Sequence, residues 1–235
     1  MQLRDASFLV VDVETTGLSP DEHRITEIAM VRVENGEIRD HFQTLVNPEQ
    51  FIPPFITSHT GITNAMVFGK PTFAEIAPEL ERFMQASPEA VLVGHNVSFD
   101  HGFLARSLER AGRSLTLPTS DDAEHLLCTC RLARRLLPKL ERKSLKHVQD
   151  HFGIKNSRQH RAFADAEAVV DVERLLLHAV VAPRDAAVGE HAVAVEQQQL
   201  HGGEAAVEIG GGCHARAPGR GWAVVRRPPR RWAWS

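Results

Sequence analysis

The chain has 235 residues, of which 43% are apolar, and its formal net charge is −3. This length is enough for one well-buried domain of the usual size, about 100 to 200 residues, with some chain left over. The slight acidity argues against a protein that holds nucleic acid by a basic surface alone, but not against one that binds phosphates through metal ions held by carboxylates.

The first half of the sequence predicts a sheet followed by helices and one more strand. The apolar, β-branched run SFLVVDVET at 7–15 is typical of a buried strand. Within 25–46, Asn35 and Gly36 separate two strand-like segments and favour a tight hairpin, because both residues can adopt positive φ. A helix, a short strand and an amphipathic helix follow, at 73–86, 90–96 and 99–111. This order predicts an α/β protein whose mixed sheet has helices packed on it.

The second half predicts three helices and then a change of character. The runs CRLARRLLP and KSLKHVQDHFG have helical spacing, and 162–181 predicts a long helix that closes the domain. Residues 183–235 hold eight of the 16 glycines and no lysine. We therefore expect a folded domain at 1–182 and a low-complexity, disordered tail at 183–235.

Two carboxylates at the end of the first strand suggest a metal site. Asp12 and Glu14 are two residues apart on a strand, so their side chains point to the same face. Two buried carboxylates side by side repel each other, and a metal ion removes that cost. The alternative is that one of them is a strand-edge charge in water, although both follow an apolar run directly.

Three further polar residues are candidates for the same site. Asp100, in GHNVSFD, begins a predicted helix, where an acid that only balances the helix dipole is the ordinary alternative. His160 precedes Asp165 by five residues in HRAFADAEA, so both can reach one point if Asp165 lies in the long helix. For a lone histidine, a surface or hydrogen-bonded role is the alternative.

Taken together, VDVETTGL at 11–18, GHNVSFD at 94–100 and HRAFADA at 160–166 resemble the motifs of the DEDDh 3′-5′ exonuclease family. That family includes the proofreading (epsilon) subunit of bacterial DNA polymerase III. HTGIT at 59–63 also resembles a family segment, but Thr60 stands where many relatives have a histidine. The resemblance covers about residues 6–181 and implies a ribonuclease H-like α/β fold, with a mixed five-stranded sheet flanked by helices.

The resemblance also implies roles for individual residues. It implies two divalent metal ions, Mg²⁺ or Mn²⁺, with four carboxylate ligands, Asp12, Glu14, Asp100 and Asp165. His160 would be the general base. The segment that meets the terminal nucleotide would be Thr15, Thr16, Gly17 and Leu18. Asn96 and Phe99 would line the path of the strand, although Phe99 is equally consistent with a core position.

The function that follows is hydrolysis of phosphodiester bonds at the 3′ end of DNA, releasing 5′-mononucleotides in replication proofreading or repair. Two alternatives stay open: the same reaction on RNA ends, and a binding module that docks a DNA polymerase or repair protein. No apolar run approaches the ~20 residues of a membrane span, and the start of the chain shows no secretory leader. We therefore expect a cytoplasmic protein that does not associate with membranes.

Overall fold

The computed structural model describes residues 6–113, 117, 125–155 and 160–181. They contain a five-stranded sheet in the order β3-β2-β1-β4-β5. The strands are β1 (Ser7–Thr15), β2 (Ile25–Glu34), β3 (Glu37–Leu45), β4 (Val91–Gly94) and β5 (Leu126–Cys128). β1, β2 and β3 form an antiparallel meander, whereas β4 pairs in parallel with β1 and with β5. The sheet is therefore mixed, as the sequence predicts.

The hairpin between β2 and β3 has the predicted turn. Asn35 and Gly36 both have positive φ, 53° and 71°, which the tight hairpin turn requires. The tight connection places β3 at the edge of the sheet and leaves β1 in the middle. β1 is consequently buried from both sides, which suits its run of β-branched residues.

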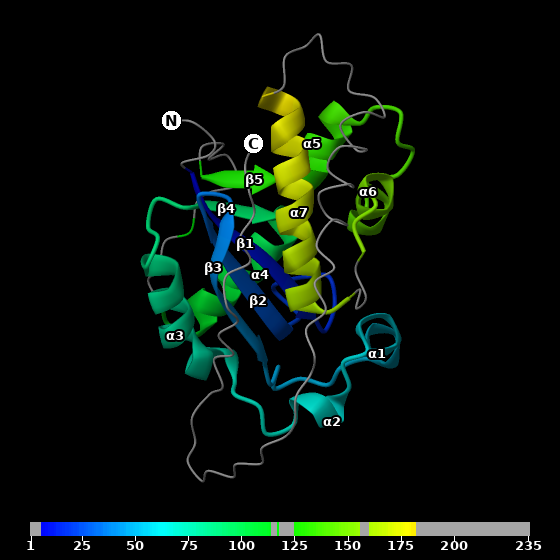
Figure 1. The fold of residues 1–235 in the computed structure, drawn as a ribbon. Helices are drawn as coiled ribbons and strands as arrows, with labels where there is room; N and C mark the ends of the chain where they lie inside the picture. Colours follow the sequence, from blue (N-terminus) through cyan, green and yellow to red (C-terminus); the bar gives the residue numbers. More distant parts are fainter. Residues whose placement is uncertain (1–5, 114–116, 118–124, 156–159, 182–235) are drawn as a thin grey trace, which may run out of the picture. The chain divides into compact units, whose positions relative to one another are not determined.

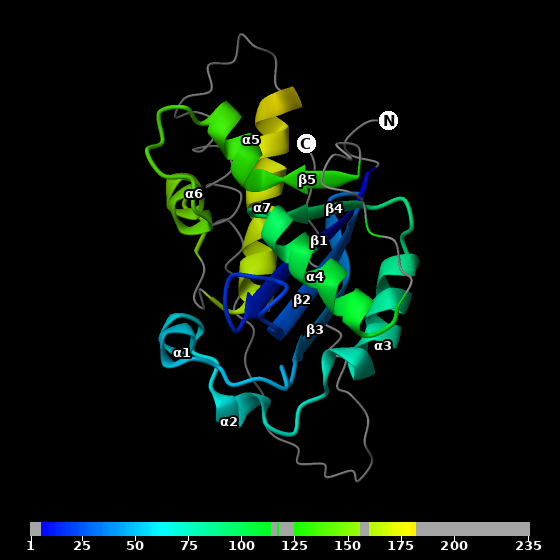
Figure 2. The same cartoon turned by 180° about the vertical axis from the view of Figure 1, so that it is seen from behind.

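Helices cover both faces of the sheet. The helices are α1 (Pro54–Thr60), α2 (Asn64–Val67), α3 (Phe73–Gln85), α4 (Ser98–Arg110), α5 (Thr129–Leu136), α6 (Leu145–Phe152) and α7 (Ala162–Val181). α7 crosses one face (Figure 1), and α4 crosses the opposite face, seen from behind in Figure 2. Among the described residues, no helix is long and apolar enough to cross a membrane.

The side chains of β1 alternate between the two cores. Leu9, Val11 and Val13 pack in the core that also contains residues of α3 and α4. Phe8 and Val10 pack in the core that contains α7 residues. The α7 residues in this core include two small, fully buried ones, Ala162 and Ala166, and small residues let a helix approach a sheet closely. The alternation places Asp12 and Glu14, the next residues in the Phe8 and Val10 series, on the α7 side.

Three short elements were not assigned from the sequence. They are α1 and α2, in the connection between β3 and α3, and the three-residue strand β5. The predicted tail at 183–235 lies outside the described residues, and so does the last residue of the predicted domain, Ala182. That boundary stays a prediction.

Candidate active site

Asp12 and Glu14 lie where β1 continues past the end of its parallel neighbour. The pairing of β1 with β4 ends at Val10 and Val93, whereas the antiparallel pairing with β2 continues to Thr15. The register also shifts between Glu14 and Thr15, an irregularity of the kind often found near functional sites. The end of β1 therefore has an open edge on the β4 side, which leaves room for other groups.

Asp100 occupies that open edge. It lies in the first turn of α4, directly after β4, and its Oδ1 accepts a hydrogen bond of 3.0 Å from the backbone N–H of Val13. The carboxylate thus takes the place of a neighbouring strand for one residue of β1. Burial nonetheless raises the pKa of Asp100 to about 7, with the backbone hydrogen bond from Val13 acting in the opposite direction.

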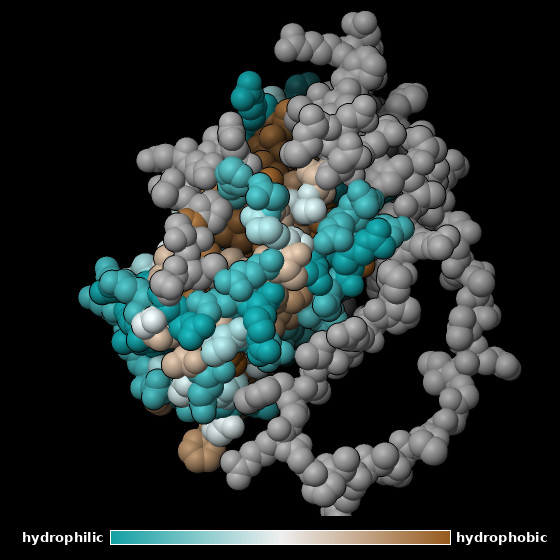
Figure 3. Space-filling model, turned by 90° about the vertical axis from the view of Figure 1, so that its left-hand side faces the viewer, coloured by the Kyte–Doolittle hydropathy of each residue, from teal (hydrophilic) through white to brown (hydrophobic). Residues whose placement is uncertain are grey.

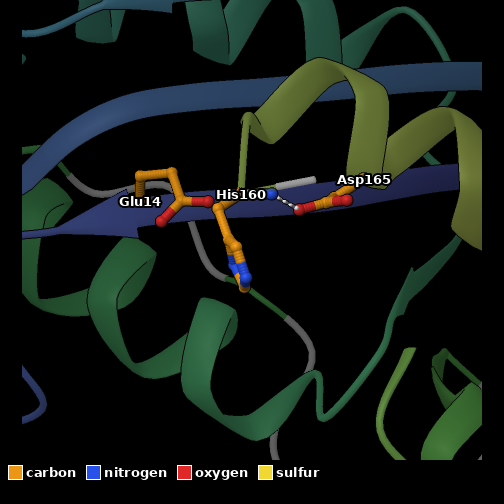
Figure 4. Close-up of side chains that lie close together, drawn as sticks. All are labelled: Glu14, His160 and Asp165. Atoms are coloured by element: carbon orange, nitrogen blue, oxygen red, sulfur yellow. Dashed lines mark hydrogen bonds between the residues drawn. The ribbon is translucent and has the colours of Figure 1, made fainter. Parts of the chain in front are cut away.

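α7 and the residues before it complete the cluster. Glu14, His160 and Asp165 each offer one ligand atom, and these three atoms lie within 4.8 Å of one another. Figure 4 shows the three side chains close together. The backbone N–H of His160 donates a 2.8 Å hydrogen bond to Oδ2 of Asp165, which fixes the turn that leads into the helix. His160 has φ +60°, in the left-handed region, and this conformation lets its ring approach β1 just before α7 begins.

The electrostatics of the cluster show an excess of negative charge. The pKa of Asp12 lies well above its usual value because the group is buried and because Asp100, Glu14, Asp165 and Glu27 are close. Burial and the same kind of repulsion raise the pKa of Glu14 to about 8. Carboxylate oxygens are the ligands that hard divalent cations prefer, and such a cation would remove the repulsion. The residues present therefore fit a divalent metal site.

His160 differs from the carboxylates because its environment favours the uncharged form. Its pKa is lowered by partial burial and by the neighbouring His59, and Asp165 acts in the opposite direction. The ring centroids of His59, in α1, and His160 are 3.9 Å apart. A neutral imidazole at this position can accept a proton.

Glu27 and Arg161 belong to the same region but were missed from the sequence. Glu27, on β2 opposite Glu14, is 1% exposed and receives two hydrogen bonds from Arg161, of 3.0 and 2.8 Å. The backbone N–H of Ala162 donates a third, of 3.1 Å. The pair fastens the start of α7 to the sheet, beside His160. A signal existed: an acid within the apolar run ITEIAMV must find a partner when it is buried.

The expected nucleotide-binding residues form a tight loop after β1. Thr15 Oγ1 donates to the backbone oxygen of Gly17 at 2.6 Å, and Leu18 is 81% exposed. A Cβ at position 17 would lie 2.1 Å from Cδ2 of His23, so only glycine fits beneath that ring. Thr16 is fully buried. The loop is thus rigidly held and presents one large apolar side chain to solvent.

The last two expected residues lie around the start of α4. Asn96 is exposed and has φ +74°, in the left-handed region. Phe99 is partly buried, packs against the core and lies 4.8 Å from the ring of Phe103. The structure thus gives Phe99 a packing role and leaves it partly exposed.

With this geometry in view, the sequence model of the exonuclease family matches residues 9–172 of the chain. The chain belongs to the exonuclease family. The resemblance seen in the three motifs is therefore confirmed. The match begins in β1 and ends in α7, so this exonuclease domain contains every residue of the cluster described above.

Curated relatives of this exonuclease domain differ greatly in length. The DNA polymerase III subunit epsilon of Aquifex aeolicus is 37% identical over 171 residues, which are 72% of this chain and 80% of that protein. The PolC-type DNA polymerase III of Clostridium perfringens is 40% identical over 168 residues, but the match spans only 11% of that protein. The 3′-5′ exonuclease DinG of Bacillus subtilis is 38% identical, with 68% of this chain and 16% of that protein covered.

Solved structures share the fold of the exonuclease domain. A complex of E. coli exonuclease I with single-stranded DNA has a TM-score of 0.65 at 22% identity, covering 74% of this chain and 41% of that one. The nuclease domain of 3′hExo, a DEDDh family member bound to rAMP, has a TM-score of 0.62 at 18% identity, covering 76% and 94%. The predicted ribonuclease H-like fold is confirmed.

Proposed function

We propose that this domain is a divalent-metal-dependent 3′-5′ exonuclease that releases 5′-mononucleotides from the 3′ end of DNA. The observation that carries the proposal is the convergence of Glu14, His160 and Asp165 within 4.8 Å, beside the half-buried Asp12 and the buried Asp100. Membership of the exonuclease family supports the reaction class.

In this proposal Asp12, Glu14, Asp100 and Asp165 hold two divalent ions, Mg²⁺ or Mn²⁺. Such ions, when bound, lower the pKa of an attacking water and stabilise the leaving 3′ oxygen. The raised pKa values of Asp12 and Glu14 support this assignment, because burial and repulsion from neighbouring acids make their ionised forms costly, and a bound cation would offset that cost.

His160 acts as the general base and accepts the proton of the water. Its lowered pKa keeps the imidazole neutral near pH 7, so it is available as a base. The hydrogen bond from its backbone to Asp165 and the Glu27–Arg161 pair hold the approach to α7 in place. Proton acceptance thus occurs at a position fixed relative to the carboxylates, which is what an oriented base requires.

In this proposal, the loop after β1 makes the enzyme specific for the 3′ end of a strand. Thr15, Thr16 and Gly17 hold a fixed backbone next to the carboxylates, and exposed Leu18 is free to wedge against the terminal base. Asn96 and Phe99 flank the strand from the start of α4. A strand with no free 3′ end would have to pass this loop, so the proposal predicts stepwise removal from the end.

DNA is the proposed substrate because two of the relatives are DNA polymerases or their subunits, and exonuclease I was solved with single-stranded DNA. Proofreading or repair, in association with a polymerase or repair protein, is the corresponding biological role. RNA is the second candidate, because the structurally similar 3′hExo nuclease domain was solved with rAMP.

The test uses 5′-labelled single-stranded DNA and RNA oligonucleotides with Mg²⁺ or Mn²⁺. The wild-type protein is compared with Asp12→Ala and His160→Ala. We expect a ladder that shortens from the 3′ end of DNA, is lost in EDTA, and is absent with both variants. Faster degradation of RNA would reverse the substrate assignment, and no cleavage of either polymer would contradict the proposed function.

A binding module remains the competing kind of function. Truncation after residue 182 separates the two, because an autonomous nuclease retains its activity without the remaining residues. Loss of partner association with full retention of hydrolysis would assign docking to residues 183–235.

A further inference from the structure

Large apolar side chains are exposed in the segment that joins β3 to α3. Phe51 and Phe55 are each 67% exposed, and Phe68 is 86% exposed. In contrast, the described surface in the lower part of Figure 3 is mostly hydrophilic. Three exposed phenylalanines in fewer than twenty residues are therefore unusual for this molecule and suggest a binding surface.

Two contacts connect part of this segment to the candidate active site. The ring of His59, in the last turn of α1, lies 3.9 Å from the ring of His160. At the other end, Gln50 accepts a 2.7 Å hydrogen bond from Thr16 and donates one of 3.0 Å to the backbone oxygen of Glu22. Residues 50–60 are thus fastened both to the proposed base and to the loop after β1. Figures 1 and 2 both show α1 next to the start of α7.

Helix geometry then places Phe55 on the same face of α1 as His59, which contacts His160. Phe55 and His59 are four residues apart in α1, so they lie on the same face of the helix, about 6 Å apart. Phe51 directly follows Gln50, which contacts the loop after β1. Phe68, at the end of α2, has no contact with the site among those described.

We propose that Phe55 and Phe51 form a stacking surface for the unpaired bases that precede the 3′-terminal nucleotide. The inference rests on the proposed function and adds a requirement to it: the strand must be single-stranded or frayed over several nucleotides, because a base stacked on phenylalanine has left its duplex. Aromatic rings bind every base through its π face, so the surface tolerates any sequence. The substrate strand is the proposed occupant, because this segment contacts both the proposed base His160 and the loop after β1.

The first test compares Phe55→Ala, Phe51→Ala and the matched control Phe68→Ala on a 5′-labelled single-stranded oligonucleotide. Stacking of one base corresponds to about a fivefold change or more in binding. We expect each of the first two variants to lower kcat/KM by about that factor, while Phe68→Ala has no effect. Phe55→Trp, which keeps an aromatic ring at this position, should have the same kcat/KM as the wild-type protein. All three side chains are exposed, so melting temperatures should remain unchanged.

The second test removes the base instead of the ring. An abasic residue is placed in turn at the second, third and fourth positions from the 3′ end. At one of these positions, the abasic residue should lower kcat/KM for the wild-type protein but cause no further loss in Phe55→Ala. At a different position, it should lower kcat/KM for the wild-type protein but cause no further loss in Phe51→Ala. Hydrolysis of thymidine 5′-monophosphate p-nitrophenyl ester, which has no upstream base, should be equal in all variants.

The outcomes separate this inference from the proposed function. If the wild-type protein degrades no DNA, the proposed function fails. If it degrades DNA and Phe55→Ala and Phe51→Ala match it on every oligonucleotide, only the stacking surface is overturned. Equal losses in Phe55→Ala and Phe68→Ala would also overturn it, because they would indicate a general effect of removing surface phenylalanines.

Discussion

Burial raises the pKa values of two carboxylates, Asp12 and Glu173, but the two regions differ in whether other acids lie nearby. Around Asp12, four other acids add to the effect of burial. Around Glu173, on α7, burial alone raises the pKa, to about 8, and the nearby Arg174 acts in the opposite direction. Within the described part of the chain, Oε1 of Glu173 has no hydrogen-bond partner. Burial by itself therefore does not mark a site, whereas convergence of like charges does.

The largest expected effect is the loss of hydrolysis in Asp12→Asn. Lewis-acid stabilisation contributes several kcal/mol to a transition state, so we expect kcat to fall by about 10³-fold or more. Glu173→Gln is the matched control, since it makes the same change to a buried acid outside the cluster, and it should leave kcat unchanged. Single-turnover cleavage of labelled single-stranded DNA measures both. Comparable losses of kcat in the two variants would show that the acidic cluster around Asp12 matters no more for hydrolysis than a lone buried acid.

The second prediction concerns His160→Gln. Loss of a general base typically costs about 10²- to 10⁴-fold in rate, so kcat should fall by that order while KM changes little. His147→Gln, in α6, is the control, because the contact described for that ring is with Ser144 and not with the cluster. A raised KM with an unchanged kcat would instead assign His160 to substrate binding and not to proton transfer.

The third prediction tests the lone carboxylate through the pH dependence of stability. Glu173 keeps its proton in the folded state up to about pH 8, whereas in the unfolded state it loses it near its ordinary value. The unfolded state therefore binds fewer protons in between, and the free energy of unfolding falls as pH rises through this window.

Glu173→Gln removes that contribution. Relative to the wild type, the variant should gain stability from pH 4 to pH 8, by an amount on the order of 3 kcal/mol. Urea denaturation in EDTA at both values measures the difference, with Glu109→Gln, an exposed acid, as control. An equal difference at both pH values would show that Glu173 is not titrating in this window.

The smallest expected effect is stabilisation by metal. Mg²⁺ or Mn²⁺ at 100 times its dissociation constant should raise the free energy of unfolding by about 2.7 kcal/mol, because it binds the folded state. Glu173→Gln should retain this gain and Asp165→Asn should lose most of it. Thermal melting with and without metal measures the shift. A gain retained in Asp165→Asn would place the metal away from the cluster.

The sequence predicted those features that depend on local pattern. The period-two alternation in β1 placed Asp12 and Glu14 on one face, and Asn35 and Gly36 specified the hairpin. β5 was not recognisable, because three residues carry too little pattern and become a strand only by pairing with β4. α1 was also missed, because it is only seven residues long and begins at the second of two consecutive prolines.

Contacts between residues that are far apart in the sequence could not be predicted from local sequence patterns. The pair of buried Glu27 and half-buried Arg161 joins residues 134 positions apart. The contact of His59 with His160 joins two segments that belong to separate sequence motifs. The assigned roles of Asp12, Glu14, Asp100, His160 and Asp165 came from resemblance, and the geometry adds that these residues share one charged region. Their catalytic roles stay predictions that the variants above test.

The position of α7 at the end of the domain has a consequence for synthesis of the protein. α7 carries Asp165, and His160 directly precedes it, so the other three acidic residues of the cluster leave the ribosome well before the last two. At about 5 to 20 residues per second, that interval lasts several seconds. A chain interrupted in this interval lacks both the proposed base and one metal ligand, and it exposes the apolar face that Val10 and Val31 share with α7. Only a chain that has completed α7 carries all five residues of the proposed mechanism.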